Sequence, residues 1–429
     1  MESAMILGLL LLLLGSGLPV AWSFAGTIIA LVITYDINVT ILMIQGFRSL
    51  NSVVLLALPL FILAGYLMQS GGIASRLIKF IELYLGKSRG GIGNAMIGAS
   101  GFFGAVSGTA TAAVAAVGTL MVGPMEERGY PRNYSAALLG ISSLLGILFP
   151  PSITMILFAV ATQQSVAALF AATIIPGVLL AIGLMLFNRY QVGRLFHEEL
   201  VKETTSARDK LTIFYRTLPA LALPVIIIGG IYGGIFTPTE AAAFSVVAAI
   251  VVGFFFYRDL TLHKLCNSTI SASVITGSIV LILLFSFVIG RILVAERVPQ
   301  DLAYLVSSSI TNPTLIILFV VTFLIVVGAL IDDVSVTVVI APLLLPLMQT
   351  AGVDPVHFAA IVATSVVIGS NSPPMAPLLF MACKISKTSI QSSFKPAFQM
   401  IGFVALPIML LTAFIPSISL SLPRWLGLL

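Results

Sequence analysis

The chain alternates long apolar runs with short polar breaks, and this pattern predicts membrane-spanning helices. A helix needs about 20 apolar residues to cross the hydrocarbon core of a bilayer. Charges and clusters of Pro or Gly cut the chain into about a dozen pieces of that size. The first piece, residues 5–35, is too long for one plain span and is interrupted at residues 15–19. The other pieces are 53–68, 92–122, 134–162, 166–187, 218–236, 241–256, 270–293, 315–330, 334–348, 357–383 and 398–415.

Composition supports a polytopic, all-α membrane protein. Of the 429 residues, 59% are hydrophobic and 9% are charged, whereas soluble domains carry about 25% charged residues. This excludes a water-soluble globular protein, a disordered chain and a nucleic-acid binder. The net charge of +5 comes from short basic clusters between apolar runs, as in the loops of membrane proteins. Two distant cysteines, Cys266 and Cys383, indicate neither a disulfide framework nor a metal site.

A single extended polar stretch divides the chain into two halves. We expect an N-terminal half over residues 1–187, a connector over 188–217 and a C-terminal half over 218–429. The connector contains six Lys and Arg residues against four Asp and Glu residues, and the positive-inside tendency places it in the cytoplasm. A shorter amphipathic segment between Arg76 and Arg89 is predicted to lie along the membrane surface.

The two halves repeat each other. Pro124 precedes Pro150 by 26 positions, and Pro346 precedes Pro373 by 27, with offsets of 222 and 223 between the halves. Each half runs from an apolar helix through a Pro-containing turn to a Pro-Pro pair inside an apolar segment. Secondary transporters are commonly built from two repeats whose broken helices meet near the bilayer midplane. The repeat therefore favours a transporter over a pore or a membrane enzyme.

The Pro-Pro pairs predict oxygen-rich helix breaks. Proline removes N–H donors and disfavours helical geometry at the preceding residue, so carbonyls around 146–149 and 369–372 lose their helical partners. Within a membrane such carbonyls need protein, water or ions, and clustered oxygens suit a small hard cation. The helix that restarts after Pro151, with Ser152 in its first turn, presents N–H groups that favour an anionic substrate group.

Two further polar features lie within the apolar segments. Ser107, Thr109 and Thr111 belong to a stretch of small residues, which fits either a helix-packing seam or cation coordination. Shifted by 222, this stretch falls on residues around 328–333. Asp332 and Asp333 there are either intramembrane functional carboxylates or charges of a surface loop.

Other polar residues have structural explanations. Thr237 and Glu240 form a helix-start pattern, in which Thr237 caps the helix and Glu240 reaches back. His357 is predicted to mark a helix start after Asp354, and the three histidines are too isolated for a proton relay.

The motifs together resemble the large membrane subunit of tripartite ATP-independent periplasmic (TRAP) transporters, over nearly the whole chain. One motif departs from the family pattern, because Ser-Pro-Pro-Met-Ala stands at 372–376 where Thr-Pro-Pro-Val-Gly is usual. The motifs that carry the resemblance are Ser-Gly-Thr-Ala-Thr-Ala-Ala at 107–113, Gly-Pro-Met at 123–125, Gly-Tyr-Pro at 129–131, Phe-Pro-Pro-Ser at 149–152, Phe-Thr-Pro-Thr-Glu at 236–240, Asp-Pro-Val-His-Phe at 354–358 and Gly-Ser-Asn-Ser-Pro-Pro at 369–374.

The resemblance implies an inverted-repeat, elevator-type transporter with about 10–12 spans and two re-entrant hairpins whose helices are broken at Pro-Pro. It implies a multi-pass location in the bacterial inner membrane, a small four-helix membrane subunit, and a periplasmic substrate-binding protein that delivers an organic acid. The chain begins directly with its own first span, so the small subunit is expected on a separate polypeptide.

The resemblance also implies sodium as the coupling ion, with two or more sites, and no nucleotide. The chain has no Gly-x-x-x-x-Gly-Lys-Ser/Thr loop. Carried over by motif position, one sodium site takes in Ser107, Thr109, Gly146, Phe149 and Pro151. The repeat-related site takes in Gly328, Asp333, Gly369, Ser372 and Pro374. The candidate substrate-binding residues are Thr111, Ser152, Asp332 and Asn371.

The expected function is therefore sodium-coupled import of an organic acid. Likeness to sialate-type members with a separate small subunit favours sialic acid, and a C4-dicarboxylate is the alternative. An ion channel or passive anion pore is the alternative from a different class, and would show rings of charge or hydrophobic constrictions. We do not expect an enzyme, since no Ser/His/Asp or His-Glu-x-x-His constellation appears in the spans.

Overall fold

The protein is helical throughout the part of the chain that the structure describes. This computed structural model describes residues 2–35, 37–86, 88–194, 196, 198, 207–373 and 376–429. The helices of the first half are α1 (Glu2–Gly15), α2 (Val20–Tyr35), α3 (Val39–Leu50), the 3₁₀ turn η1 (Val53–Leu56), α4 (Ala57–Ser70), α5 (Ile73–Leu85), α6 (Gly91–Ser107), α7 (Ala110–Glu127), α8 (Arg132–Ser142), α9 (Leu145–Leu148), α10 (Ile153–Thr162) and α11 (Val166–Val192). The second half contains α12 (Ala207–Tyr232), α13 (Pro238–Val251), α14 (Leu262–Ala295), α15 (Val298–Ser309), α16 (Pro313–Gly328), α17 (Asp333–Ser335), α18 (Ala341–Thr350), α19 (Pro355–Gly369), α20 (Pro377–Ile385), α21 (Ile390–Met400), α22 (Leu406–Phe414) and α23 (Pro416–Trp425), with π-helical turns η2 (Val252–Phe256), η3 (Val336–Ile340) and η4 (Ile401–Ala405).

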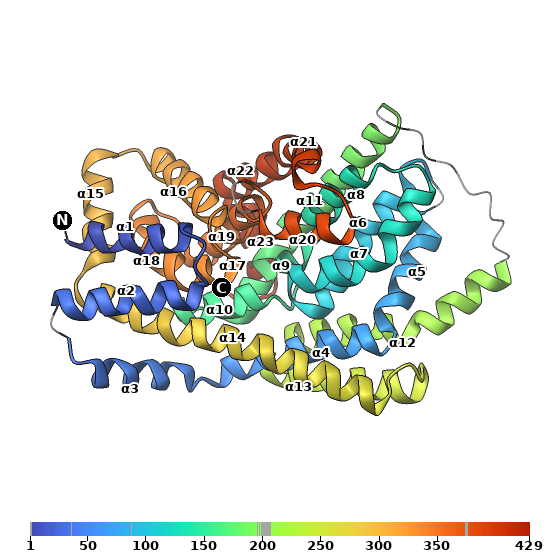
Figure 1. Ribbon diagram of the computed structural model, residues 1–429, viewed down its shortest axis with the longest axis horizontal. Helices are drawn as coiled ribbons and strands as arrows, with labels where there is room; N and C mark the ends of the chain where they lie inside the picture. The colour runs from blue at the N-terminus through green and yellow to red at the C-terminus, as the bar shows by residue number, and fades with distance from the viewer. Residues whose placement is uncertain are drawn as a thin grey trace.

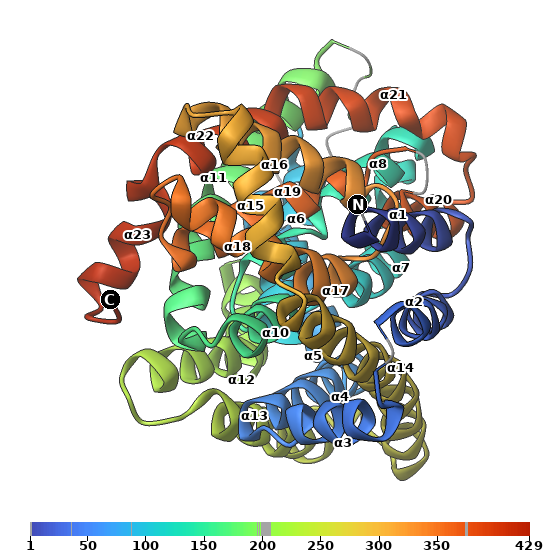
Figure 2. The ribbon, with the colours of Figure 1, turned by 90° about the vertical axis from the view of Figure 1, so that its left-hand side faces the viewer.

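The helices form two groups, which we call the outer layer and the repeat body. The outer layer consists of α2, α3, α4, α12, α13 and α14, and Figure 1 shows α3, α4, α13 and α14 along its lower edge. In this layer α4 packs on α13 and α14, while α14 also contacts α2 and α3. The repeat body consists of α6–α11 and α16–α22, and Figure 2 shows it stacked above the outer layer.

The apolar core runs through the repeat body and continues under the outer layer. Phe158 of α10 and Phe358 of α19 meet edge to face with 6.0 Å between ring centroids, both fully buried. A second cluster joins the outer layer to α5 through buried residues such as Leu67, Leu77 and Leu223. The main core cluster itself contains Phe24 of α2 and Phe61 of α4 together with Phe158, so apolar packing joins the two groups.

Several helices have the length and composition of membrane spans. Seven qualify in the part of the chain that the structure describes, or eight if the bent pair Arg132–Leu148 and Ile153–Thr162 is one span. Four further apolar helices are shorter, at α2, α3, α16 and α19. On α14 the outward residues include Ile270 and Val274, which are 62% and 64% exposed, and an apolar surface of this kind is stable against lipid.

The structure confirms the breaks and caps expected from local sequence. The first apolar run is interrupted where predicted, since α1 ends at Gly15 and α2 starts at Val20. Thr237 and Glu240 form a complete capping box at the start of α13, with the Thr237 N–H 2.8 Å from the Glu240 carboxylate. Asp354 caps α19. The helices around the first Pro-Pro pair bend by 46°.

The expected connector is helical at both ends. Helix α11 runs on to Val192, and α12 already begins at Ala207. Between them, the Glu198 carboxylate accepts hydrogen bonds from the N–H groups of Gly90 (2.5 Å) and Ile92 (3.3 Å) at the start of α6. The ring of Phe196 packs on Tyr130 with 4.7 Å between centroids. This part of the connector is therefore fastened to the first repeat.

Candidate functional site

The first element of the candidate site is a helix break between α6 and α7. Helix α6 ends at Ser107, and Gly108 follows with φ +69°, a left-handed conformation that glycine adopts without strain. Thr109 then caps α7, its hydroxyl accepting the Ala112 N–H at 3.2 Å. Sequence reasoning treated residues 92–122 as one uninterrupted span. The signal it missed is Ser-Gly-Thr, a glycine helix end followed at once by an N-cap residue.

The second element is the Pro-Pro break between α9 and α10, and the two breaks meet. Ser152 caps α10, and the N–H of Ile153 donates to the Gly108 carbonyl at 3.1 Å. A Cβ on Gly108 would lie 2.7 Å from the Pro151 carbonyl oxygen, and one on Gly146 would lie 2.9 Å from the Thr109 carbonyl oxygen. Only glycine permits this approach of two broken backbones.

The structure therefore brings together four of the five residues predicted for the first sodium site. Ser107, Thr109, Gly146 and Pro151 lie at the crossing of the two breaks, where the Ser107 hydroxyl also points to the Thr109 carbonyl at 3.5 Å. The fifth residue, Phe149, follows α9, and its ring turns toward Gly101 and Gly177. Carbonyl and hydroxyl oxygens prevail here, which is the donor set that hard cations take.

The second repeat builds the same arrangement. Asp332 caps α17, its carboxylate accepting the N–H of Ser335 at 3.2 Å and the hydroxyl of Ser335 at 2.6 Å. It stands 223 positions after Thr109, the cap of α7. A Cβ on Gly369 would lie 2.6 Å from the carbonyl carbon of Gly328, as one on Gly104 would lie 2.3 Å from the Cα of Gly146. The repeat seen in sequence is thus present in the backbone contacts.

The residues predicted for the second sodium site are less closely gathered than those of the first. Gly328 and Gly369 touch, while the Ser372 hydroxyl donates to the Ile368 carbonyl at 2.8 Å. The carboxylate of Asp333 accepts the hydroxyl of Thr154, from the first repeat, at 2.9 Å. Pro374 lies outside the described residues.

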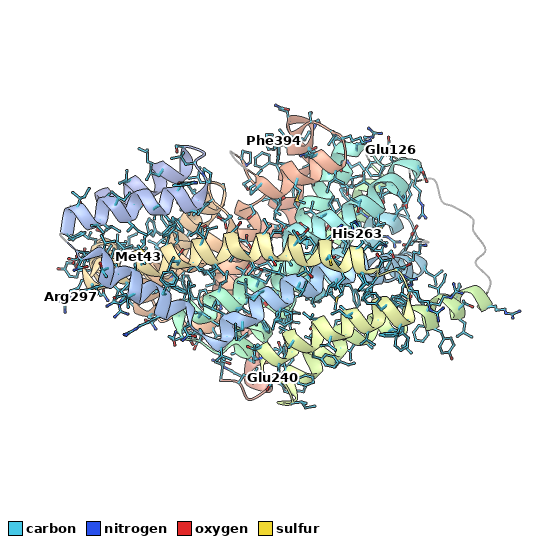
Figure 3. The ribbon with its side chains drawn as sticks, turned by 60° about the horizontal axis from the view of Figure 1, so that its bottom comes forward. Met43, Glu126, Glu240, His263, Arg297 and Phe394 are labelled. Carbon is cyan, nitrogen blue, oxygen red and sulfur yellow. The ribbon has the colours of Figure 1, made fainter. Side chains whose placement is uncertain are left out.

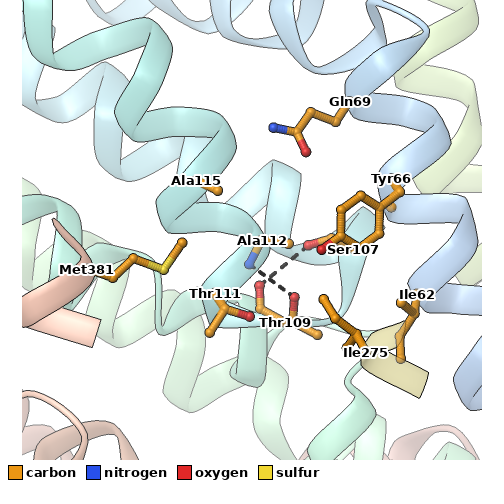
Figure 4. A pocket seen from close by; sticks show the side chains of 11 residues that line it. Ile62, Tyr66, Gln69, Ser107, Thr109, Thr111, Ala112, Ala115, Ile275 and Met381 are labelled. Atoms are coloured by element: carbon orange, nitrogen blue, oxygen red, sulfur yellow. Dashed lines mark hydrogen bonds between the residues drawn. The ribbon is translucent and has the colours of Figure 1, made fainter. Parts of the chain in front are cut away.

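A cavity of about 180 Å³ opens beside the first break (Figure 4). The N-terminal turn of α7 faces it through Thr109 and Thr111, next to Ser107. Figure 4 shows Tyr66 and Gln69 of α4 on the opposite wall and Met381 of α20 at one side. The cavity therefore lies between the outer layer and the repeat body. Its complete lining is Ile62, Gly65, Tyr66, Gln69, Ser107, Thr109, Thr111, Ala112, Ala115, Ile275 and Met381.

Of the four residues predicted to bind substrate, Thr111 lines this cavity. Ser152 is fully buried, and its hydroxyl accepts the Met155 N–H as the cap of α10. The Asp332 carboxylate is likewise engaged in a helix cap, at the start of α17. Asn371 is 1% exposed and lies against α8, where a Cβ on Gly140 would be 2.8 Å from its Oδ1. A substrate role for these residues stays a prediction.

The cavity also contains functional candidates that sequence reasoning missed. Tyr66 and Gln69 stand three residues apart on the mostly apolar helix α4, a spacing that puts both on one face. A polar pair at this spacing in an apolar helix is the signal that could have identified them. Ile275 and Met381 are apolar residues in apolar helices, so their sequence carried no such signal.

The electrostatics of the cavity depend on dipoles, because none of its lining residues is charged. The first N–H groups of a helix have no intrahelical acceptor, so Ala110 and Thr111 at the start of α7 present a partial positive charge. Oxygens of the Ser107, Thr109 and Thr111 side chains lie on the same wall. Such a site can hold an anionic group at the helix start and a cation among the oxygens.

Comparisons with known proteins identify a transporter family. The family model for the tripartite ATP-independent periplasmic transporter, DctM component, matches residues 7–418. The C4-dicarboxylate TRAP transporter large permease protein DctM of Rhodobacter capsulatus is 32% identical over 443 residues, covering all of both chains. The sialic acid TRAP transporter large permease protein SiaM of Vibrio cholerae is 31% identical, covering 87% of each chain.

A solved structure shares the fold. The YdaH transporter of Alcanivorax borkumensis, described as having an unusual topology, superposes with a TM-score of 0.57 at 14% identity, over 90% of this chain and 87% of that one. Together with the match over nearly the full length, this confirms an all-helical, multi-pass membrane protein with a transporter fold. The chain belongs to the family of TRAP transporter large permease components, the DctM family.

Proposed function

We propose that this chain is the large permease subunit of a sodium-coupled TRAP transporter that imports a small organic acid across the bacterial inner membrane. The observation that carries the proposal is the cavity in which the start of α7 faces Tyr66 and Gln69. A helix start favours a carboxylate, and the family's named members act on organic acids.

The uncharged lining supports cation coupling. An anion buried without a paired charge is strongly disfavoured, and no Lys, Arg or His lines the cavity. A sodium ion at the adjacent crossing of the two breaks would supply the compensating charge. Ser107, Thr109, Gly146 and Pro151 would hold it through hydroxyl and carbonyl oxygens, with Phe149 contributing its carbonyl. The second ion would be held around Gly328, Asp333, Gly369 and Ser372.

The substrate proposed first is a C4-dicarboxylate, with sialic acid as the second candidate. The cavity of about 180 Å³ is smaller than the roughly 300 Å³ at which pockets for drug-sized ligands begin. A four-carbon diacid is the more compact of the two acids. Relatives that carry either kind of acid match at similar identity. The choice of a C4-dicarboxylate as the first candidate therefore rests on the volume of the cavity.

The position of the cavity between two groups of helices supports an elevator mechanism. Its walls come from α4 and α14 of the outer layer, and from α6, α7 and α20 of the repeat body. A displacement of the repeat body against the outer layer would carry a site on α7 past α4. A small membrane subunit and a periplasmic binding protein complete the proposed assembly.

Uptake by purified protein in proteoliposomes tests the proposal. The chain, its small subunit and the co-encoded binding protein are reconstituted with radiolabelled succinate or sialic acid outside. We expect accumulation that requires both the binding protein and an inward sodium gradient. Uptake that is indifferent to sodium would contradict coupling, and current far above carrier turnover would favour a channel.

A further inference from the structure

A second hollow adjoins the cavity and leads away from it between α4 and α14. It measures about 280 Å³ and shares Tyr66 and Gln69 with the cavity. These two side chains therefore stand at the boundary of both spaces. We call this second hollow the α4–α14 vestibule, lined by Tyr66, Gln69, Ser70, Lys264, Asn267, Ser268 and Ser271.

The α14 wall of the vestibule is a polar stripe on a long apolar helix. Asn267 and Ser268 lie three and four residues after Lys264, and Ser271 lies four and three residues after them, which places all four on one face. The same face reaches the cavity at Ile275, four residues further on. Elsewhere α14 is outwardly apolar, as at Ile270 and Val274. The vestibule face of α14 is therefore polar over two turns, although α14 also exposes hydroxyls on other faces, as at Thr269 and Ser278.

The two helices are joined along this face. The hydroxyls of Ser70 and Ser268 lie 2.9 Å apart in a direct hydrogen bond between α4 and α14. Gln69, one residue earlier, is exposed and lines both spaces. The vestibule therefore has a hydrogen-bonded polar floor and an exposed amide at its inner boundary.

Lys264 supplies a positive charge at the outer end. Its ammonium donates to the main-chain carbonyl of Asp259 at 2.8 Å. The Asp259 carboxylate is itself paired with Arg76 at 2.5 Å. Among the described residues Lys264 forms no ion pair, so its charge is not neutralised by a carboxylate. It is the one charged member of the vestibule lining.

The vestibule opens at a definite end of the molecule. Figure 3 shows His263, the neighbour of Lys264, near the start of α14 and Arg297 beyond its other end. Helix α12 leaves the connector, and α13 returns to the side on which α14 begins. The connector end is the one predicted to be cytoplasmic from its charges. Substrate in the cavity would thus meet the vestibule on its way to the cytoplasm.

We infer that the α4–α14 vestibule is the cytoplasmic release path for the anionic substrate, with Lys264 as its transient counter-charge and Tyr66 and Gln69 as its inner boundary. The inference rests on the proposed function. A carboxylate leaving the α7 helix start would pass hydroxyl and amide groups and then an unpaired ammonium. A single opposite charge beside a polar hollow raises the local concentration of an anion.

Thiol labelling tests the charge of the vestibule without requiring transport. The background variant is Cys266→Ser with Cys383→Ala, because Cys266 is exposed on α14 itself. In that background Ser271→Cys places a thiol inside the vestibule, and Thr269→Cys, two residues away, places one on another face of α14. We expect the ratio of the anionic to the cationic methanethiosulfonate rate to be about three to ten times higher at Ser271→Cys than for a free thiol in solution.

Adding Lys264→Gln should abolish that preference, and Lys264→Arg should retain it. Thr269→Cys should show no preference for the anionic reagent. A rate ratio at Ser271→Cys equal to that of a free thiol, or a preference that survives Lys264→Gln, would overturn the vestibule as an anion path.

Substrate exchange in proteoliposomes tests release. Lys264→Gln should slow exchange of internal and external acid about two- to tenfold at low ionic strength, and the deficit should shrink as salt rises. Lys264→Arg and the surface variant Lys395→Gln should behave as wild type. If the anionic reagent labels Ser271→Cys preferentially but the protein transports no acid, the proposed function is contradicted and the charge of the vestibule is not. A normal exchange rate of Lys264→Gln at low salt would contradict the release path and leave the proposed function standing.

Discussion

The hydroxyl of Thr154 donates a hydrogen bond to the carboxylate of Asp333 over 2.9 Å, and so joins the restarted helix of one repeat to the broken helix of the other. Thr154 is 2% exposed and lies in the first turn of α10, while Asp333 begins α17. A carboxylate removed from water needs such donors. A side-chain hydrogen bond therefore joins the neighbourhoods of the two predicted sodium sites.

Replacing Thr154 tests the strength of this link. Thr154→Val keeps the shape and removes the donor, and should lower the free energy of unfolding by about 1–2 kcal/mol. Thr154→Ser keeps the donor and should lie close to wild type. Thermal unfolding in detergent measures the difference. Equal midpoints for the Val and Ser variants would mean that the hydrogen bond contributes nothing measurable.

The crossing of the two helix breaks should not tolerate a methyl group. In Gly104→Ala the new Cβ would lie 2.3 Å from the Cα of Gly146, so the backbones must separate. We expect a loss of stability of about 2 kcal/mol or more, together with lost uptake. The matched control is Gly123→Ala in α7, where nothing lies within 4 Å and alanine gains helix propensity. Similar stability of the two variants would contradict a close crossing.

Removing a proposed cation ligand should weaken sodium dependence selectively. Ser107→Ala and Asp333→Asn should each raise the sodium concentration for half-maximal uptake roughly fivefold, the equivalent of about 1 kcal/mol. Ser278→Ala, which removes an exposed hydroxyl from α14, serves as the control. The measurement is uptake against external sodium at constant ionic strength. Unaltered sodium dependence in both site variants would refute these ligand assignments.

The cavity predicts different outcomes for two hydroxyl residues that sequence reasoning grouped together. Thr111→Val removes a polar group from the cavity wall and should raise the half-saturating concentration of acid a few-fold, with little loss of stability. Ser152→Ala removes a buried helix cap and should cost about 1 kcal/mol of stability, with affinity for the acid preserved once folded. Calorimetric unfolding and concentration-dependent exchange separate the two. If Ser152→Ala instead weakened the affinity for the acid and Thr111→Val did not, the substrate would bind at α10.

Local sequence chemistry predicted much of this fold. Proline pairs, cap residues and apolar run lengths act over a few residues, so the break after α9, the capping box at Thr237 and the start of α19 could all be predicted. The break at Gly108 acts just as locally, but it was hidden within a long apolar run. Recognising it required treating Ser-Gly-Thr as a helix end and a new start.

Contacts between distant segments could not be predicted in the same way. The approach of Gly104 to Gly146 depends on how two helix breaks cross, and the Thr154–Asp333 bond depends on how one repeat sits against the other. The repeat offset placed the stretch of Ser107, Thr109 and Thr111 against residues around 328–333, where Asp332 caps α17 as Thr109 caps α7. It held no information on which helix of the outer layer would cover them, so Tyr66 and Gln69 were missed.

The fastening of Glu198 to the start of α6 gives the connector a maximum reach. Helix α12 of the outer layer begins at Ala207, nine peptide steps later. A fully extended chain spans at most about 3.5 Å per step, so the two anchoring points can never be more than roughly 30 Å apart while Glu198 stays bound. That length is comparable to the thickness of the hydrocarbon core of a bilayer. In the proposed elevator mechanism the connector would act as a tether on the repeat body, and lengthening or shortening it would change how far that body could travel.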